Sequence, residues 1–210
     1  MIHCSIGIWD LSSLAQPQII TVFANMIFLF IIDDHYDMYQ FMIKAIEDNT
    51  YEERPELTAF QRVNYRLLSE IHRHSDEETF EYHRTYLLEY LYNSLFEVSL
   101  SKMSKINSDV YYRARTSWGG SGTICIPGFT APQMKEWVYA SKHSHLFSDL
   151  LTHMATFTAL WNDMNSWKKE LNEKGNLNVF SILDNEEDVY NYSLSRLKLM
   201  ANQQLDYHNA

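Results

Sequence analysis

The sequence predicts an all-α fold, and three observations support this prediction. The chain has 210 residues, of which 46% are hydrophobic, which is enough for a buried core in one domain. Only six glycines and four prolines occur, too few for a turn-dense β architecture. Apolar residues recur at helical spacing between polar connections. We therefore expect residues 1–210 to form a single α-helical domain.

The first long helix is expected over residues 19–39, with Pro17 in its first turn. The segment is apolar nearly all round as far as Asp33, which is typical of a central helix in a bundle. It is too short to span a bilayer, and it lacks the basic start and the cleavage site of a signal peptide. Because Cys4 and Cys125 provide no disulfide framework, we expect a soluble, cytoplasmic protein.

Polar connections separate the later helices that the sequence predicts. Pro55 could start the second helix, whose apolar positions up to Ile71 follow helical spacing. The segment 107–109 offers a helix cap, and glycines from Gly119 onward stop the helix that follows. The expected helices after the first are at residues 55–71, 79–103, 110–115, 131–142, 145–172 and 184–207.

Histidines lie close together near the end of the second predicted helix. His72, His74 and His83 have mostly polar neighbours, and residues two apart on a helix point to different sides. We therefore expect these three in a surface turn rather than in a metal site. The histidines near residue 145 receive the same interpretation, although His153 lies on an apolar helical face.

Two groups of polar side chains follow apolar helical segments. Asp33 and Asp37 are one turn apart on the first predicted helix, where two carboxylates repel each other unless a cation lies between them. Asn162, Ser166 and Glu170 form one row along a later helix. A solvated face is the alternative for this row taken alone, but the apolar residues before it predict a buried face. Amide, hydroxyl and carboxylate oxygens suit a hard cation such as Mg²⁺.

The two motifs, D-D-x-x-D at residues 33–37 and N-D-x-x-S-x-x-x-E at residues 162–170, resemble those of class I terpene synthases of the microbial type. The resemblance covers residues from about 17 to 206. It implies a helical bundle around a central cavity. It also implies a lyase that ionises an allylic prenyl diphosphate, most commonly C15, and cyclises or deprotonates the carbocation to a terpene such as a sesquiterpene.

The resemblance assigns the metal ligands residue by residue. Asp33 and Asp37 would hold two Mg²⁺ ions, and Asn162, Ser166 and Glu170 would hold a third. Mn²⁺ could replace Mg²⁺ at these positions.

Further residues match the family pattern around these ligands. Asp34 would lie behind the metal ligands, Asp163 would orient a neighbouring basic group, and Lys169 would add positive charge near the diphosphate. Arg115 falls on the arginine that senses the diphosphate, and Gly119 on the glycine whose carbonyl helps trigger ionisation. Arg113, at a less suitable spacing from the glycine, is the rival for the arginine, and a surface position before a loop is the alternative for Arg115.

Apolar residues one or two turns before each motif are the candidates for the hydrocarbon pocket. They lie on the side of the helix that carries the motif, where an aromatic face could stabilise a cation. Core packing is the alternative for each of them. The candidates are Met26, Leu29, Phe30, Ala155 and Thr158.

The expected ligand is a small-molecule prenyl diphosphate. The net charge of −10 argues against nucleic acid as a partner, while an acidic pocket can bind a diphosphate through cations. In the family the first motif usually lies further from the N-terminus, and the family's late Arg–Tyr pair has no counterpart before Ala210. We therefore expect part of the N-terminal and the closing C-terminal helices to be lacking. A homodimer could cover the exposed flank.

Two alternatives to a terpene synthase remain open from the sequence. Prenyl diphosphate synthases share the fold and the first motif, but their second motif is rich in aspartate instead of carrying Asn, Ser and Glu. A catalytically impaired fragment, or a non-enzymatic helical binding protein derived from a terpene synthase, is the alternative outside enzymes.

Overall fold

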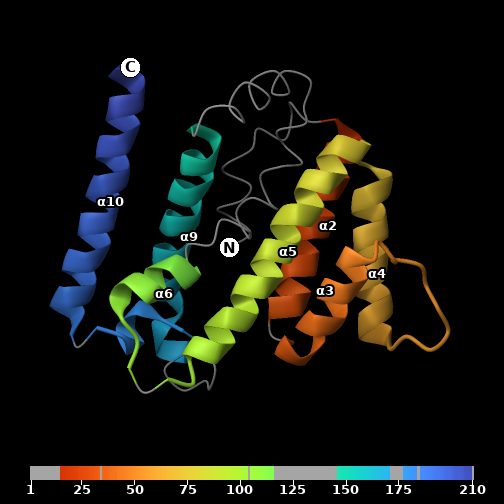
Figure 1. Cartoon of the computed structure of the whole chain (residues 1–210), viewed down its shortest axis with the longest axis horizontal. Helices are drawn as coiled ribbons and strands as arrows, with labels where there is room; N and C mark the ends of the chain where they lie inside the picture. Colours follow the sequence, from red (N-terminus) through yellow and green to blue (C-terminus); the bar gives the residue numbers. More distant parts are fainter. Residues whose placement is uncertain are drawn as a thin grey trace. The chain divides into compact units, whose positions relative to one another are not determined.

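The computed structural model describes residues 15–33, 35–103, 105–115, 146–170, 177–183 and 185–209 (Figure 1). All regular elements in these ranges are helices, so the all-α prediction is confirmed. The chain divides into two compact units, residues 1–92 with 119–143 and residues 93–118 with 144–210. The expectation of one domain stays a prediction.

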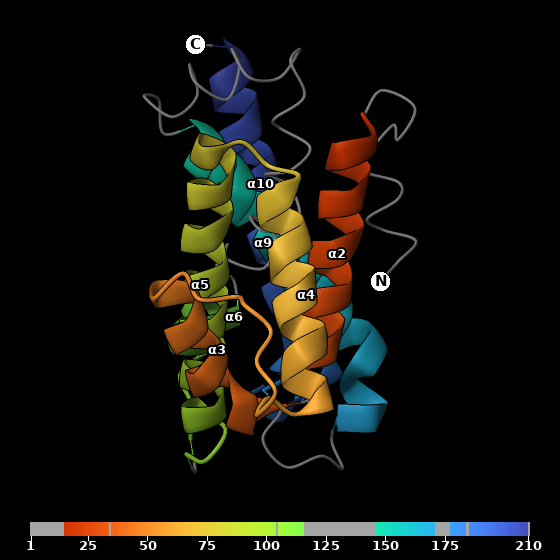
Figure 2. The same ribbon diagram turned by 90° about the vertical axis from the view of Figure 1, so that its right-hand side faces the viewer.

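The first unit is built on a pair of adjacent helices. α2 (Gln16–Asp33) and α4 (Ala59–Arg73) lie side by side in both ribbon views (Figures 1 and 2). The other described helices of this unit are a 3-10 helix, η2 (Tyr36–Met38), α3 (Tyr39–Glu47) and the first part of α5 (Glu77–Leu100). The fully buried side chains of this unit include Phe28, Ile32, Tyr39, Met42, Ile46, Tyr65, Leu68, Ile71, Phe80, Leu87 and Leu91.

The prediction of one continuous helix over residues 19–39 is wrong. α2 ends at Asp33, and a separate 3-10 helix, η2, covers Tyr36–Met38 before α3 begins. Between them His35 has φ −124° and ψ 62°, outside the helical region. The His35 Nδ1 lies 2.8 Å from the Ile31 carbonyl oxygen. The His35 side chain thus gives this carbonyl the hydrogen-bond partner that a backbone N–H of the next turn would provide in a continuous helix. Asp33 and Asp37 therefore do not share one helix.

α4 begins at Ala59, four residues later than the position of Pro55 suggested. Thr58 is the N-cap: its hydroxyl accepts a hydrogen bond from the Gln61 N–H, and the Gln61 side chain accepts one from the Thr58 N–H. This reciprocal pair satisfies two N–H groups at the helix start. Pro55 lies in the turn before the cap. The sequence-based prediction placed the helix start at Pro55, although the Thr58–Gln61 spacing of a capping box was already present in the sequence.

His83 lies in the core and not in a surface turn, which corrects the prediction for this residue. It is 1% exposed, and its Nε2 is 2.8 Å from Asn25 Oδ1 of α2. Among the described residues, neither His83 Nδ1 nor Asn25 Nδ2 has a hydrogen-bond partner. Burial lowers the pKa of His83 from 6.5 to about 4, because the charged imidazolium would lose its hydration.

Acid is expected to destabilise the fold through His83. Between pH 6.5 and pH 4 the unfolded state binds a proton that the folded state excludes, so the free energy of unfolding falls as the pH falls. The loss amounts to roughly 3 kcal/mol across this window. Urea titrations at several pH values should show a shallower slope for His83→Gln than for the wild type. Parallel profiles for His83→Gln and the wild type would contradict the assignment.

The second unit gathers its helices around α9. Besides the last part of α5, it contains α6 (Ser108–Arg115), α9 (Leu146–Glu170), the 3-10 helix η3 (Val179–Ser181) and α10 (Glu186–Asn209). α9 contacts α6, η3 and α10. Leu100, Tyr111, Ala114, Leu177, Val179 and Val189 form a buried apolar cluster.

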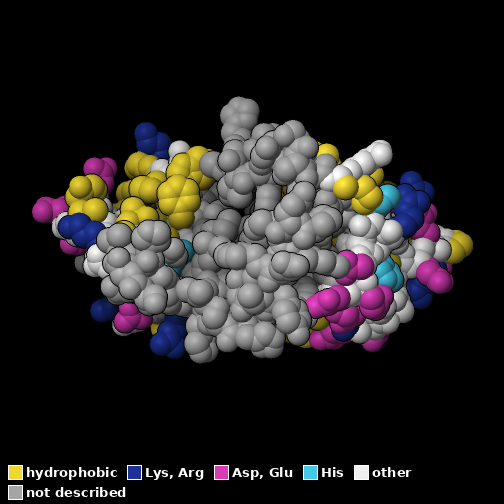
Figure 3. All heavy atoms as spheres, turned by 90° about the horizontal axis from the view of Figure 1, so that it is seen from above, with side chains coloured by type: hydrophobic (Ala, Val, Ile, Leu, Met, Phe, Trp, Pro, Cys, Tyr) yellow, Lys and Arg dark blue, Asp and Glu magenta, His cyan; other side chains and the backbone are white. Residues whose placement is uncertain are grey.

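Charges at helix starts follow the helix dipole. Figure 3 shows acidic side chains gathered over the first turn of α5, which contains Glu77 and Glu78. Negative charge there offsets the partial positive charge of the unpaired N–H groups. At the start of α6, the Asn107 side chain accepts a hydrogen bond from the Asp109 N–H at 2.7 Å, as the capping pattern predicted.

Within the described ranges, no helix has the length and apolar character needed to cross a bilayer.

Candidate metal and diphosphate site

The first acidic motif lies at the end of α2 in the first unit. Asp33 is the last residue of α2, and Asp37 lies in η2 with its side chain exposed. Asp34 and the side chain of Asp33 lie outside the described residues. Among the described side chains, no group of three or more His, Cys, Asp or Glu has the arrangement of a metal site. The metal-binding role of this motif therefore stays a prediction.

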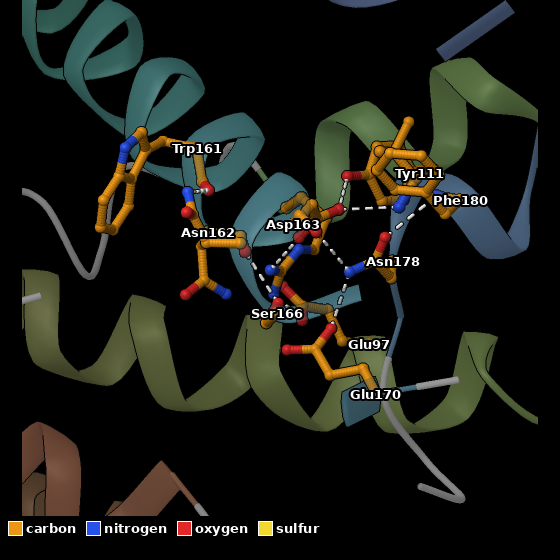
Figure 4. A network of polar contacts seen from close by, with 12 residues as sticks. Glu97, Tyr111, Trp161, Asn162, Asp163, Ser166, Glu170, Asn178 and Phe180 are labelled. Atoms are coloured by element: carbon orange, nitrogen blue, oxygen red, sulfur yellow. Dashed lines mark hydrogen bonds and ion pairs between the residues drawn. The ribbon is translucent and has the colours of Figure 1, made fainter. Parts of the chain in front are cut away.

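The second motif forms a row of oxygen-bearing side chains on α9. Asn162, Ser166 and Glu170 are all half-buried and lie along the same side of the helix (Figure 4). The Ser166 hydroxyl donates to the Asn162 carbonyl oxygen at 2.8 Å, which leaves its own oxygen free to accept or to ligate. Glu170 Oε2 accepts a hydrogen bond from Asn178 Nδ2 at 2.8 Å. Within the described part of the chain, the Asn162 amide makes no hydrogen bond.

Asp163 turns away from this row and is fully buried (Figure 4). Its Oδ1 accepts a hydrogen bond from Arg115 Nη2 at 2.5 Å. Its Oδ2 accepts hydrogen bonds from the Val179 N–H at 2.8 Å and from the Tyr111 hydroxyl. Three donors from α6 and η3 thus converge on one carboxylate of α9. This convergence pins the three elements to one another next to the row.

Arg115 is the basic group beside Asp163. It is the last residue of α6, where a cation also interacts favourably with the helix dipole, and its side chain is 18% exposed. Burial alone would lower the pKa of Arg115, but the carboxylates of Asp163 and Glu97 hold that pKa well above its usual value. Glu97 Oε2 accepts from Arg115 Nη1 at 3.1 Å. Arg115 Nε is buried and has no hydrogen-bond partner among the described residues.

Tyr111 is a fixed hydrogen-bond donor in this network. Burial, together with the neighbouring charge of Asp163, raises the pKa of Tyr111 well above its usual value. The hydroxyl therefore stays protonated and can only donate to the carboxylate. We refer to Glu97, Tyr111, Arg115, Asp163, Asn178 and Val179 as the Asp163 network.

The remaining predicted site residues have varied positions. Lys169 and Arg113 are exposed on α9 and α6, and Gly119 lies outside the described residues. Of the pocket candidates before the first motif, Met26 is buried and Leu29 is half-buried, while the side chain of Phe30 is not described. Before the second motif, Ala155 is buried and Thr158 is exposed. The structure gives positions for these residues but does not test their roles.

Three residues of this network were not predicted from the sequence: Glu97, Tyr111 and Asn178. Tyr111 lies four residues before Arg115, so helical spacing alone places both on one face of α6. Asn178 could have been found as a capping residue, because it precedes a short apolar segment and Ser181 follows at the spacing of a capping box. Glu97 lies within a long aromatic helix, and its pairing with Arg115 depends on tertiary structure.

Residues 24–194 match the family model for the C-terminal metal-binding region of terpene synthase family 2. The matched range includes both motifs and the whole Asp163 network. No curated protein and no solved structure matched the chain.

Proposed function

The chain belongs to the terpene synthase family. We propose that it is a Mg²⁺-dependent terpene synthase that acts on an allylic prenyl diphosphate, with C15 as the expected chain length. The observation that carries this proposal is the arrangement on and beside α9. A row of oxygen-bearing side chains lies next to a half-buried arginine that is held charged by two carboxylates. The row of oxygens can bind a cation, and the arginine can bind an anion. A diphosphate that binds through Mg²⁺ and through a positively charged side chain requires both.

The second motif fits a magnesium ion by the chemistry of its side chains. The Asn162 amide oxygen, the Ser166 hydroxyl oxygen and the second carboxylate oxygen of Glu170 are hard oxygen donors on one helix side. They would hold one ion, and Asp33 and Asp37 would hold two more. When bound, Mg²⁺ neutralises the charge that develops on the departing diphosphate.

Arg115 would bind the diphosphate as a cation, and its Nε–H has no hydrogen-bond partner among the described residues. Asp163 and Glu97 hold the guanidinium group of Arg115 from two sides. The side chain is therefore already in place, and substrate binding does not have to order it. Lys169 would add positive charge from the exposed side of α9. A preorganised cationic group stabilises the leaving group as the allylic C–O bond breaks and its electron pair departs with the diphosphate.

The other half of the site must be apolar. The carbocation left by ionisation either attacks its own double bonds or loses a proton, and water must be excluded for both outcomes. Met26, Leu29 and Phe30 precede the first motif, and Ala155 and Thr158 precede the second. We propose that these residues line the hydrocarbon end of the pocket.

The test is a product assay with and without the metal. The purified chain is incubated with C10, C15 and C20 prenyl diphosphates in Mg²⁺ or in excess EDTA, and the volatile products are identified by mass spectrometry. We expect a cyclic or rearranged hydrocarbon that forms only with Mg²⁺, because the charge on the leaving group would otherwise stay uncompensated. A condensation product of longer chain length would point to a prenyl diphosphate synthase. Absence of turnover from the folded protein would contradict the proposed activity.

A further inference from the structure

We propose that Asn178, outside both motifs, is a positioning residue that fixes the carboxylate of Glu170 for metal binding. The inference rests on the proposed function, since it takes Glu170 as a ligand of the third metal ion. Asn178 follows α9 in the chain and caps η3, and it is 3% exposed. It is therefore a buried side chain from a neighbouring element that reaches back to the motif (Figure 4).

Both N–H groups of the Asn178 side chain are used on α9. Nδ2 donates to Glu170 Oε2 at 2.8 Å and to the Asp163 carbonyl oxygen at 3.1 Å. The two acceptors are seven residues apart, which is about two helical turns. One amide thus links the backbone near the start of the motif to the side chain at its end.

The orientation of the Asn178 amide follows from its other hydrogen bonds. The Asn178 Oδ1 accepts a hydrogen bond from the Phe180 N–H at 3.0 Å. The amide oxygen therefore faces η3, and the amide nitrogen faces Glu170. The adjacent Val179 N–H donates to Asp163 Oδ2 at 2.8 Å, which holds the same segment against α9. Phe180 stacks on Trp167 with ring centroids 5.0 Å apart. These contacts brace Asn178, so it can act as a fixed donor.

A neutral donor suits the position beside Glu170. Glu170 is the last residue of α9, where a carboxylate is disfavoured by the helix dipole. A lysine or arginine there would orient the carboxylate but would also cancel the charge that attracts a cation. The Asn178 amide orients Oε2 and leaves the negative charge and Oε1 available. Partners of this kind behind a metal ligand typically contribute 10- to 100-fold to metal affinity.

The experiment is a titration with Mn²⁺ in the presence of inorganic diphosphate, followed by electron paramagnetic resonance, which reports bound ions without turnover. In Asn178→Ser the serine keeps a cap acceptor for η3 but cannot reach Glu170. We expect Mn²⁺ to bind about tenfold more weakly to one site. Ser181→Ala is the matched control, because it removes the other half of the capping box and leaves the Asn178–Glu170 contact intact. It should bind Mn²⁺ like the wild type.

A double-mutant cycle separates positioning from a structural role. In a Glu170→Gln background, Asn178→Ser should cause no further loss of Mn²⁺ affinity, whereas an equal loss in both backgrounds would overturn the proposal. Wild-type affinity in Asn178→Ser would also overturn it. If Asn178→Ser does not fold, Asn178→Thr provides the same cap with different bulk. Absence of Mn²⁺ binding by the wild type would instead contradict the proposed function.

Discussion

Replacing Asp163 with asparagine is expected to destabilise the second unit by about 3–5 kcal/mol, the typical cost of removing one partner from a buried ion pair. Asp163 is fully buried, and Arg115 would keep its charge while losing its closer carboxylate. The Tyr111 hydroxyl and the Val179 N–H would also lose an ionised acceptor. Such a loss is a large part of the stability of a small domain.

The measurement is urea unfolding followed by circular dichroism, with a surface ion pair of the same unit as the control. Asp109 pairs with Arg196 at 2.9 Å, but its side chain is 75% exposed. Exposed pairs contribute about 0–1 kcal/mol, so Asp109→Asn should shift the unfolding midpoint only slightly. Similar shifts for both variants would show that the Asp163 network does not hold the unit together.

Replacing Asn162 with alanine is expected to reduce turnover about 100-fold or more while leaving the free energy of unfolding nearly unchanged. The amide makes no hydrogen bond within the described residues, so its removal breaks no contact there. As a metal ligand it would help hold the charge that stabilises the departing diphosphate, a contribution of several kcal/mol in metal-dependent enzymes. Activity and stability should therefore separate at this position, unlike at Asp163.

Asn165 provides the matched control for Asn162. It is the same residue type on the same helix, exposed, with its Nδ2 donating to the Trp161 carbonyl oxygen at 2.6 Å. The turnover number of Asn165→Ala with the preferred prenyl diphosphate should equal that of the wild type. Equal losses in the two variants, or an unaltered turnover number in Asn162→Ala, would exclude Asn162 as a ligand.

The row on α9 was predictable because it depends on one helix alone. Residues at intervals of four share a side of any α-helix, so the spacing of Asn162, Ser166 and Glu170 fixes their alignment once the helix forms. The helices themselves followed from the apolar periodicity. The break after Asp33 was not predictable in the same way, because it occurs without glycine or proline, and the residue that completes the α2 terminus, His35, has little effect on helix propensity by itself.

Contacts between distant segments account for the remaining differences. His83 has mostly polar neighbours in sequence, yet α2 supplies Asn25 from 58 positions away and makes the site a buried one. Asn178 lies outside the motif that it contacts, and its role appears only when η3 packs against α9. Local spacing carries no information about either pairing, since both depend on which helix faces cover each other.

The end of α2 at Asp33 has an electrostatic consequence for a cation. The last carbonyl groups of a helix carry a partial negative charge, equivalent to roughly half an elementary charge. The last turn of α2 contains no basic residue, so this charge is not offset from within the helix. Under the proposed function, the backbone terminus of α2 would attract Mg²⁺ together with the aspartates of the motif. A helix running on to Asp37 would place its negative terminus a full turn or more further along the chain, so ending at Asp33 keeps the backbone charge at the first residue of the motif.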